Sequence, residues 1–304
     1  MQSKVITHGK VILIGEHSVV YGFLALALPT PSIQIETVLT EIATPDNQLV
    51  TSDYDGPLES APANYGGIVF EATELVHKFQ IDQKFSLTFN GEIPEERGLG
   101  SSAAVALGTI KVLQKHFNLH LTNDEITSLA NAAETINHGS ASGLDVATVS
   151  SNHLISFTKQ SGLTQVREKL GAYLVIADSG ELGNTKQAVA QVRGQLRENP
   201  ARSNELAQLN HYAELTLQSF TQHDSVLLGE QMNAAQRVLH GFDLSTAKID
   251  ALIDEALANG ALGSKISGGG LGGIVISLAA DQAVAEQIKL AQNKIAKNIW
   301  IEEI

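Results

Sequence analysis

In the segment PEERGLGSSAA, residues 94–104, a glycine-rich loop leads directly into a predicted helix, which is the most informative local pattern of the sequence. Apolar side chains at positions 107, 110 and 113 share one face and predict that helix over residues 101–117. The first turn of a helix has unpaired N–H groups and the positive end of its dipole, and glycines let the backbone approach phosphate oxygens. The segment therefore predicts an anion-binding loop; the alternative is a plain loop whose serine caps the helix.

Two other phosphate-binding motifs can be tested against this region. Gly98, Gly100 and Ala103 match the loose dinucleotide fingerprint, but residues 90–97 separate them from the preceding strand, where the fingerprint requires direct succession. A P-loop needs Gly-Lys followed by Ser or Thr, and Gly9-Lys10 is followed by valine. The context therefore argues against the dinucleotide fingerprint, and the P-loop is excluded. The hydroxyls of Ser101 and Ser102 remain as candidate ligands for phosphate or for a hard cation.

A second glycine-rich segment, KISGGGLGGIV, covers residues 265–275. Here a strand follows the glycines, so a formal match to the dinucleotide fingerprint is accidental. The pattern predicts a glycine turn between two strands. Such a turn wraps a ligand with its backbone, or is merely a flexible hairpin.

Two further segments contain charged side chains that are not needed for packing. In GKVILIGEHSVVYG, residues 9–22, Lys10 and the pair Glu16-His17 bracket a buried strand; the alternative is a solvated surface pair. In ETINHGSASGLD, residues 134–145, a carboxylate stands at each end of a tight loop. One would hold a cation and the other would face a substrate hydroxyl, unless the second simply caps the next helix.

Histidines suggest no transition-metal site. His116 and His120 have i, i+4 spacing but lack the glutamate of a zincin motif, so both are expected to be ordinary helix residues.

The coarse element order predicts an α+β protein. Strands are expected at 11–14, around 33–35, at 85–89 and at 154–157, with helices at 68–79, 101–117 and from a Thr122/Glu125 capping box, and a loop over 45–62. The second half should run strand (172–177), three or four helices (185–257), strand, strand (274–278), helix (281–294) and strand (299–301), a split βαβ layout. We expect two domains, 1–165 and 166–304.

Composition narrows the class of protein. The formal net charge is −13, with 43% apolar residues and no cysteine. An acidic globular protein is a poor partner for nucleic acid or an anionic membrane, and thiolate metal sites and disulfides are excluded. The longest near-apolar run, 19–28, is far too short for a membrane span, and 11–14 is too short for a signal peptide. We therefore expect a soluble cytoplasmic protein.

Together these segments resemble the three motifs of the GHMP small-molecule kinases, named for galactokinase, homoserine kinase, mevalonate kinase and phosphomevalonate kinase. The resemblance covers essentially the whole chain. The segments 10–22 and 134–145 and the string Asp178, Asn184, Thr185, Lys186 resemble the mevalonate kinase branch. One departure is Ala141, where relatives often have proline. The resemblance implies an N-terminal domain of the ribosomal protein S5 domain 2-like fold and a ferredoxin-like C-terminal domain.

The same resemblance implies ATP-dependent phosphorylation of the 5-hydroxyl of mevalonate, with Mg²⁺ as cofactor. Asp145 would accept the hydroxyl proton beside Lys10, and Ser102 and Glu134 would ligate the metal. The remaining implied residues are, for the ATP phosphates, Pro94, Gly98, Leu99, Gly100, Ser101, Ser102 and Ala103, and, for mevalonate, Glu16, His17, Thr185, Gly268, Gly269 and Gly270.

Two alternatives remain open at this stage. The chain could phosphorylate a related alcohol, such as phosphomevalonate or a sugar, although a phosphorylated substrate should require more Arg or Lys than Lys10, Arg97 and Lys186. It could also be a ligand sensor that kept the fold without the chemistry, which the intact candidate residues argue against. The oligomeric state is not fixed by the sequence, and a homodimer is compatible with it.

Overall fold

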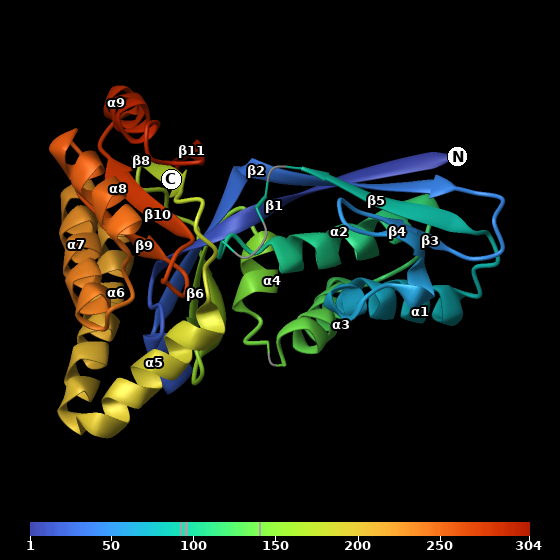
Figure 1. Cartoon of the computed structure of the whole chain (residues 1–304), viewed down its shortest axis with the longest axis horizontal. Coiled ribbons are helices and arrows are strands. Elements are labelled where there is room, and N and C mark those ends of the chain that lie inside the picture. Colours follow the sequence, from blue (N-terminus) through green and yellow to red (C-terminus); the bar gives the residue numbers. More distant parts are fainter. Residues whose placement is uncertain (92, 95–96, 140) are drawn as a thin grey trace. The chain divides into compact units, whose positions relative to one another are not determined.

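The computed structural model describes residues 1–91, 93–94, 97–139 and 141–304 (Figure 1). The chain forms two compact units that are interleaved along the sequence. Unit 1 consists of Met1–Gly9, Ile33–Ile93 and Gly100–Asn152, and unit 2 of Lys10–Ser32, Pro94–Leu99 and His153–Ile304. Two long strands, β1 (Gln2–Ile14) and β2 (Ala25–Glu41), contribute residues to both units.

Unit 1 places helices on one side of a group of strands (Figure 1). β5 (Phe85–Gly91) pairs antiparallel with the end of β2, β3 (Gln48–Val50) runs parallel to β5, and β4 (Asp55–Pro57) completes the edge. The helices are α1 (Gly66–Phe79), α2 (Ser101–His116), α3 (Asn123–His138) and the short α4 (Leu144–Val149). Two single turns, η2 (Leu58–Ser60) and η3 (Ala63–Tyr65), precede α1.

Local sequence signals explain the helices of unit 1. The apolar stripe of α1 buries Ile68, Ala72 and Leu75. The expected capping box of α3 is present, because the Thr122 hydroxyl accepts from the Glu125 N–H and the Glu125 carboxylate accepts from the Thr122 N–H. α1, α2 and α3 pack on one another, so residues on their inner faces are brought together.

Unit 2 contains the predicted split βαβ layout. Four antiparallel strands lie in the order β11-β8-β10-β9, where β8 is Tyr173–Asp178, β9 Gly263–Ser267, β10 Ile274–Ala279 and β11 Asn298–Glu303. The helices are α5 (Thr185–Glu198), α6 (Ser203–Gln222), α7 (Ser225–Gly241), α8 (Ala247–Ala258) and α9 (Gln282–Gln292). α7, α8 and α9 contact the sheet, and α6 packs on α7. This arrangement confirms the ferredoxin-like expectation.

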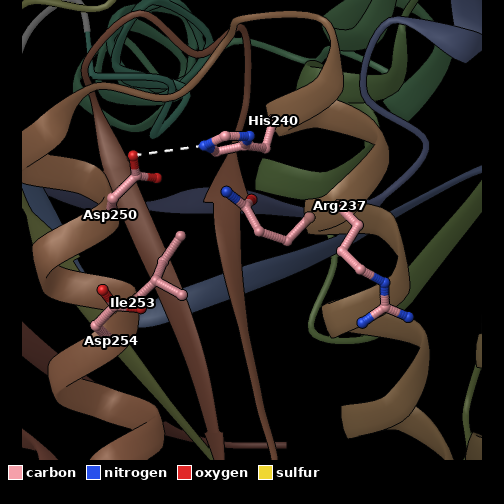
Figure 2. Close-up of a pocket in the computed structure, with 6 residues that line it drawn as sticks. Arg237, His240, Asp250, Ile253 and Asp254 are labelled. Atoms are coloured by element: carbon pink, nitrogen blue, oxygen red, sulfur yellow. Dashed lines mark ion pairs between the residues drawn. The ribbon is translucent and has the colours of Figure 1, made fainter.

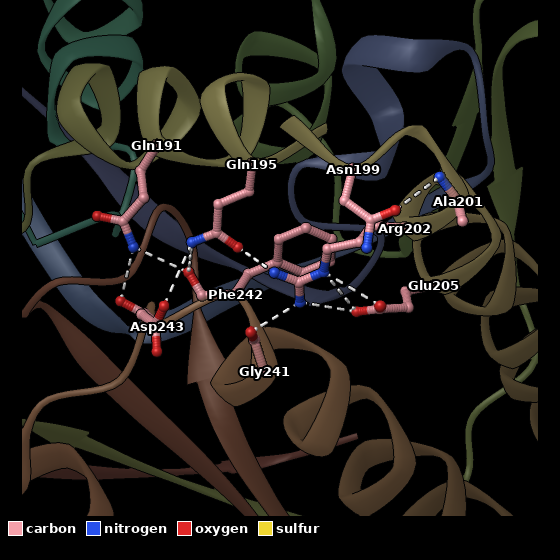
Figure 3. A network of polar contacts seen from close by, with 9 residues as sticks. All are labelled: Gln191, Gln195, Asn199, Ala201, Arg202, Glu205, Gly241, Phe242 and Asp243. Carbon is pink, nitrogen blue, oxygen red and sulfur yellow. Dashed lines mark hydrogen bonds and ion pairs between the residues drawn. The ribbon is translucent and has the colours of Figure 1, made fainter. Parts of the chain in front are cut away.

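A polar network ties the layers of helices in unit 2 together (Figure 3). Arg202, in the turn η4 (Pro200–Arg202), pairs with Glu205 at 2.8 Å and donates to the Gly241 carbonyl at the end of α7. Its guanidinium also lies 4.0 Å from the centre of the Phe242 ring, an additional cation–π contact. The network fixes the junction of α5, α6 and α7 and contains none of the candidate site residues.

Several sequence expectations were wrong or incomplete. The region 45–62 was expected to be a loop, but it contains β3, β4 and η2, because β3 finds a partner in β5. A strand was missed at β7 (Gly162–Val166), which pairs with β6 (Leu154–Thr158). His120 lies beyond the end of α2 and not within a helix, whereas His116 hydrogen-bonds with Ser3 and Glu41 as an ordinary packed residue. Within the described part of the chain, no helix is long and apolar enough to cross a membrane.

Candidate active site

The loop before α2 ends in a conformation that leaves the start of the helix open. Gly98 and Gly100 both have positive φ, +84° and +72°, which glycine adopts without strain. Gly100 is the N-cap residue, and a glycine has no side chain with which to cap the first turn. The serine-cap alternative was therefore wrong. The uncapped first-turn N–H groups of this 16-residue helix are available to an anion, as the anion-binding expectation requires.

In unit 2, hydrogen bonds hold the end of β1 against the motif loop and against β9. The Lys10 N–H donates to the Leu99 carbonyl at 2.8 Å. The Ser267 hydroxyl donates to the carbonyl of Ile12 and accepts from its N–H, both at 2.9 Å. The turn after β1 requires glycine, because a Cβ on Gly15 would lie 2.5 Å from the Ala25 Cα. Lys10 itself is buried, 5% exposed.

Glu16 forms an ion pair in the interior of unit 2. Its Oε1 accepts from the Lys265 ammonium, which also donates to the Ile266 carbonyl at 2.6 Å. Both side chains are essentially inaccessible, at 1% and 0% exposure. Burial lowers the pKa of Lys265, and the carboxylate of Glu16 opposes that shift. The surface-pair alternative for Glu16 was therefore wrong.

His17 contacts the glycine turn between β9 and β10. Its Nε2 lies 2.8 Å from the Gly269 carbonyl oxygen. Because a carbonyl only accepts, Nε2 carries the hydrogen and Nδ1 is left as an acceptor in the neutral ring. Burial lowers the pKa of His17, partly offset by the bond to Gly269, so the ring is held neutral. The same turn approaches Thr185, since a Cβ on Gly269 would lie 2.8 Å from the Thr185 Oγ1.

Arg97 links the motif loop to β8 and to the glycine turn. Its Nε lies 3.1 Å from the Asp178 carboxylate and its Nη2 donates to the Gly180 carbonyl at 3.1 Å. Both side chains are buried, at 8% and 0% exposure. A Cβ on Gly273 would lie 3.0 Å from the Arg97 carbonyl oxygen. The two glycine-rich segments therefore approach each other within unit 2.

In unit 1, the two candidate metal ligands lie on helices that pack together. Ser102 is in the first turn of α2, and its Oγ accepts from the Asn137 amide of α3 at 3.1 Å. Glu134, also on α3, is 7% exposed and lies 3.9 Å from His138. No group of three or more His, Cys, Asp or Glu side chains among the described residues forms a ready metal cage. A hydroxyl plus one carboxylate suits Mg²⁺, which takes its other ligands from phosphates and water.

A second carboxylate, Glu71 of α1, lies in the core of unit 1. It is 0% exposed, and both of its oxygens lack a hydrogen-bond partner within the described residues. Burial raises the pKa of Glu71 well above its ordinary value, and the charge of Glu134 adds to the effect. This environment therefore favours the neutral, protonated form of Glu71.

Asp145 lies in the first turn of α4, whose N-cap is Gly143 with φ of +81°. Asp145 is therefore not the N-cap of this helix, and the alternative that it simply caps the next helix was wrong. Its side chain is partly exposed, and α4 packs on α2 and α3. The loop 139–143 has two left-handed glycines, Gly139 and Gly143; Ser140, within the quoted segment, lies outside the described residues.

The sequence-predicted residues divide between the two units. Lys10, Glu16, His17, Pro94, Gly98, Leu99, Thr185, Gly268, Gly269 and Gly270 belong to unit 2, and Gly100, Ser101, Ser102, Ala103, Glu134 and Asp145 to unit 1. The chain joins the two sets directly, because Leu99 and Gly100 are consecutive. Sequence reasoning gave no role to Lys265 or Asn137, although both stand in quoted segments, and missed Glu71. The buried partner of a charged residue has no local sequence signal.

Two surface depressions of the described part of the chain are lined by other residues than the predicted site residues. One, of about 430 Å³, lies between α7 and α8 in unit 2 and is shown in Figure 2. His240 and Asp250 face each other there at 3.7 Å. Its cationic and acidic side chains are mixed, and no predicted site residue lines it.

Comparison with known proteins shows the family to which this chain is similar. Residues 67–152 match the GHMP kinases N terminal domain, and residues 216–297 match GHMP kinases C terminal. The mevalonate kinase of Pyrococcus abyssi is 31% identical over 311 residues, 93% of this chain and 90% of that protein.

Solved structures extend the similarity to the fold. L. major mevalonate kinase in complex with R-mevalonate has a TM-score of 0.85 at 25% identity, over 98% of this chain and 94% of that one. Mevalonate kinase from methicillin-resistant Staphylococcus aureus MRSA252 has a TM-score of 0.79 at 28% identity, over 99% and 98%. With both family domains matched and a relative above 30% identity along nearly its whole length, the chain belongs to the GHMP kinases, in the family of the mevalonate kinases.

Proposed function

We propose that this protein transfers the γ-phosphoryl group of ATP to the 5-hydroxyl of (R)-mevalonate, giving 5-phosphomevalonate. The observation that carries the proposal is the similarity to mevalonate kinases over 93% of the chain, in a sequence that retains Lys10, Ser102, Glu134 and Asp145. The uncapped start of α2 behind two left-handed glycines supports a phosphate site.

In the proposed reaction, Asp145 orients the hydroxyl and accepts its proton. A carboxylate is too weak a base to deprotonate an alcohol in advance. Phosphoryl transfer has a loose transition state, however, so the proton can leave late and the carboxylate only has to be in place. Lys10 contributes positive charge where the alkoxide and the transferred group develop negative charge.

Residues of the two glycine-rich segments, together with Glu16, His17 and Thr185, form the substrate sites in this proposal. Pro94, Gly98, Leu99, Gly100, Ser101, Ser102 and Ala103 surround the ATP phosphates, and His17, Thr185, Gly268, Gly269 and Gly270 contact mevalonate. Glu16, which is buried in its ion pair with Lys265, belongs to the wall of the mevalonate pocket in this proposal. The neutral ring of His17 offers Nδ1 as an acceptor to a substrate hydroxyl, because Nε2 is committed to Gly269. Mg²⁺, held by Ser102 and Glu134, would offset the charge of the β- and γ-phosphates.

The deciding experiment measures ADP release by purified protein with ATP and Mg²⁺ across mevalonate, phosphomevalonate, galactose and homoserine. We expect mevalonate to give the highest kcat/KM. A higher value for phosphomevalonate or a sugar would assign a different GHMP kinase activity. Binding of mevalonate without any ADP release would instead indicate a ligand sensor. We further propose a cytoplasmic location and a homodimer, and light scattering after size exclusion tests the dimer directly.

A further inference from the structure

Asn137 connects the starts of two helices through its side-chain amide. From α3, its Oδ1 accepts the backbone N–H of Gly67 at the start of α1, at 3.0 Å, and its Nδ2 donates to the hydroxyl of Ser102 at the start of α2, at 3.1 Å. All three residues belong to unit 1. One amide therefore fixes the Ser102 side chain relative to both neighbouring helices.

The orientation of this amide is determined by its partners. An amide oxygen and nitrogen are hard to distinguish by shape, but a backbone N–H can only donate. The Gly67 N–H therefore requires Oδ1 on its side, which turns Nδ2 toward Ser102. Glycine at position 67 permits the close approach, because a Cβ there would lie 2.8 Å from Nδ2 and 3.1 Å from the Ala133 Cβ.

The hydrogen bond from Asn137 determines which part of the Ser102 hydroxyl can bind a metal ion. A serine hydroxyl has two lone pairs and one proton. The Asn137 amide occupies one lone pair, so the other is left for a cation. Glu134, the other candidate ligand, stands three residues before Asn137 on α3 and therefore lies on the same face of that helix.

We propose that Asn137 is a positioning residue for the metal ligand Ser102, and that it sets the affinity of the nucleotide complex for Mg²⁺. This inference rests on the proposed function, which makes Ser102 a ligand. Outer residues that orient a ligand typically change metal affinity about 10- to 100-fold when they are removed. An amide is suited to this role because it donates to the serine without adding a charge beside Glu134.

The experiment measures Mg²⁺ binding to the protein–ADP complex by titration calorimetry, together with ADP binding in the presence of EDTA. The variants are Asn137→Leu, Ser102→Ala and the double variant. Asn131→Leu is the matched control, because it removes an amide from the same helix whose Oδ1 has no hydrogen-bond partner among the described residues. If Asn137→Leu does not fold by circular dichroism, Asn137→Ala, which adds no atoms, replaces it.

We expect Asn137→Leu to weaken Mg²⁺ binding at least about 10-fold, with ADP affinity in EDTA changed less than about twofold. In the Ser102→Ala background the same substitution should cause no further loss, because both changes remove one interaction. The inference would be overturned if Mg²⁺ binding were weakened in Ser102→Ala but unchanged in Asn137→Leu. It would also be overturned if the losses of Mg²⁺ affinity in the two single variants added up in the double variant. Wild-type Mg²⁺ binding in Ser102→Ala would instead refute the ligand role that the proposed function gives to Ser102. A merely structural role for Asn137 would weaken ADP binding with and without metal alike.

Discussion

Lys265 and Glu16 are 249 residues apart in the sequence and form a fully buried ion pair in unit 2. The pair fixes the carboxylate that follows β1 to the strand that leads into the glycine turn. A buried carboxylate without its cation is costly, because the desolvation of the charge is no longer offset.

We therefore expect Lys265→Met to lower the free energy of unfolding by about 3–5 kcal/mol. The double variant Lys265→Met/Glu16→Gln should recover part of this loss, because no buried charge remains. Urea unfolding followed by circular dichroism measures both. Lys294→Met, which changes an exposed lysine in the turn before β11, is the control. Equal stability of Lys265→Met and the wild type would show that the pair does not carry charge in the folded protein.

Asp145→Asn should bind nucleotide normally and lose turnover by at least about 10²-fold, because the amide cannot accept the hydroxyl proton. Steady-state kinetics give kcat, and calorimetry gives the ADP affinity. Asp82→Asn, an exposed carboxylate between α1 and β5, is the matched control and should behave like the wild type. Near-normal kcat in Asp145→Asn would remove this residue from the proposed chemistry.

Gly272→Ala should destabilise the protein more than Gly162→Ala. Both glycines have positive φ, +124° and +71°; at position 162 an alanine carries a conformational cost of about 1–2 kcal/mol, and at position 272 the cost is greater because φ lies beyond the left-handed helical region. A Cβ at 162 meets nothing within 4 Å, whereas a Cβ at 272 would lie 2.5 Å from the Leu182 carbonyl oxygen. The difference between the two unfolding free energies measures the steric clash at position 272 together with the additional backbone strain there. Equal losses would mean that the glycine turn relaxes without strain.

Glu71→Gln should raise stability at neutral pH and flatten its dependence on pH. The folded pKa of Glu71 lies well above the unfolded value of 4.5, so the folded protein holds a proton that the unfolded chain has released. The free energy of unfolding is therefore highest below about pH 4.5 and decreases as the pH rises toward the folded pKa of Glu71. Glutamine does not titrate, so the variant lacks this dependence on pH. Thermal unfolding between pH 5 and 9 measures it. Glu74→Gln, an exposed residue of the same helix, should leave the slope unchanged.

Much of the fold could be predicted because its signals are local. The 3.6-residue stripe of α1 and the Thr122/Glu125 capping box place two helices without reference to any partner. β3 and β4 could not be predicted in this way. Each has three residues, in a segment rich in Asp, Gly and Pro, and they form only because β5 supplies a neighbouring strand.

The candidate site shows the same limit. The glycine-rich loop before α2 is visible in the sequence because positive φ values and a helix start demand particular residue types. The contacts that hold its side chains are not visible, because they join distant positions. Nothing near Ser102 in the sequence indicates Asn137, and nothing near Glu16 indicates Lys265. Asn137 and Lys265 lie within the quoted motif segments, but the sequence assigned no role to either of them.

The interleaving of the two units has a consequence for synthesis on the ribosome. The segment Lys10–Ser32 emerges early, but most of the residues of its unit, His153–Ile304, are made last. Unit 1, by contrast, has all of its residues by Asn152. Folding during translation can therefore complete unit 1 first, while the end of β1 that belongs to unit 2 stays without its hydrogen bonds to Ser267 of β9 until the nascent chain is nearly finished.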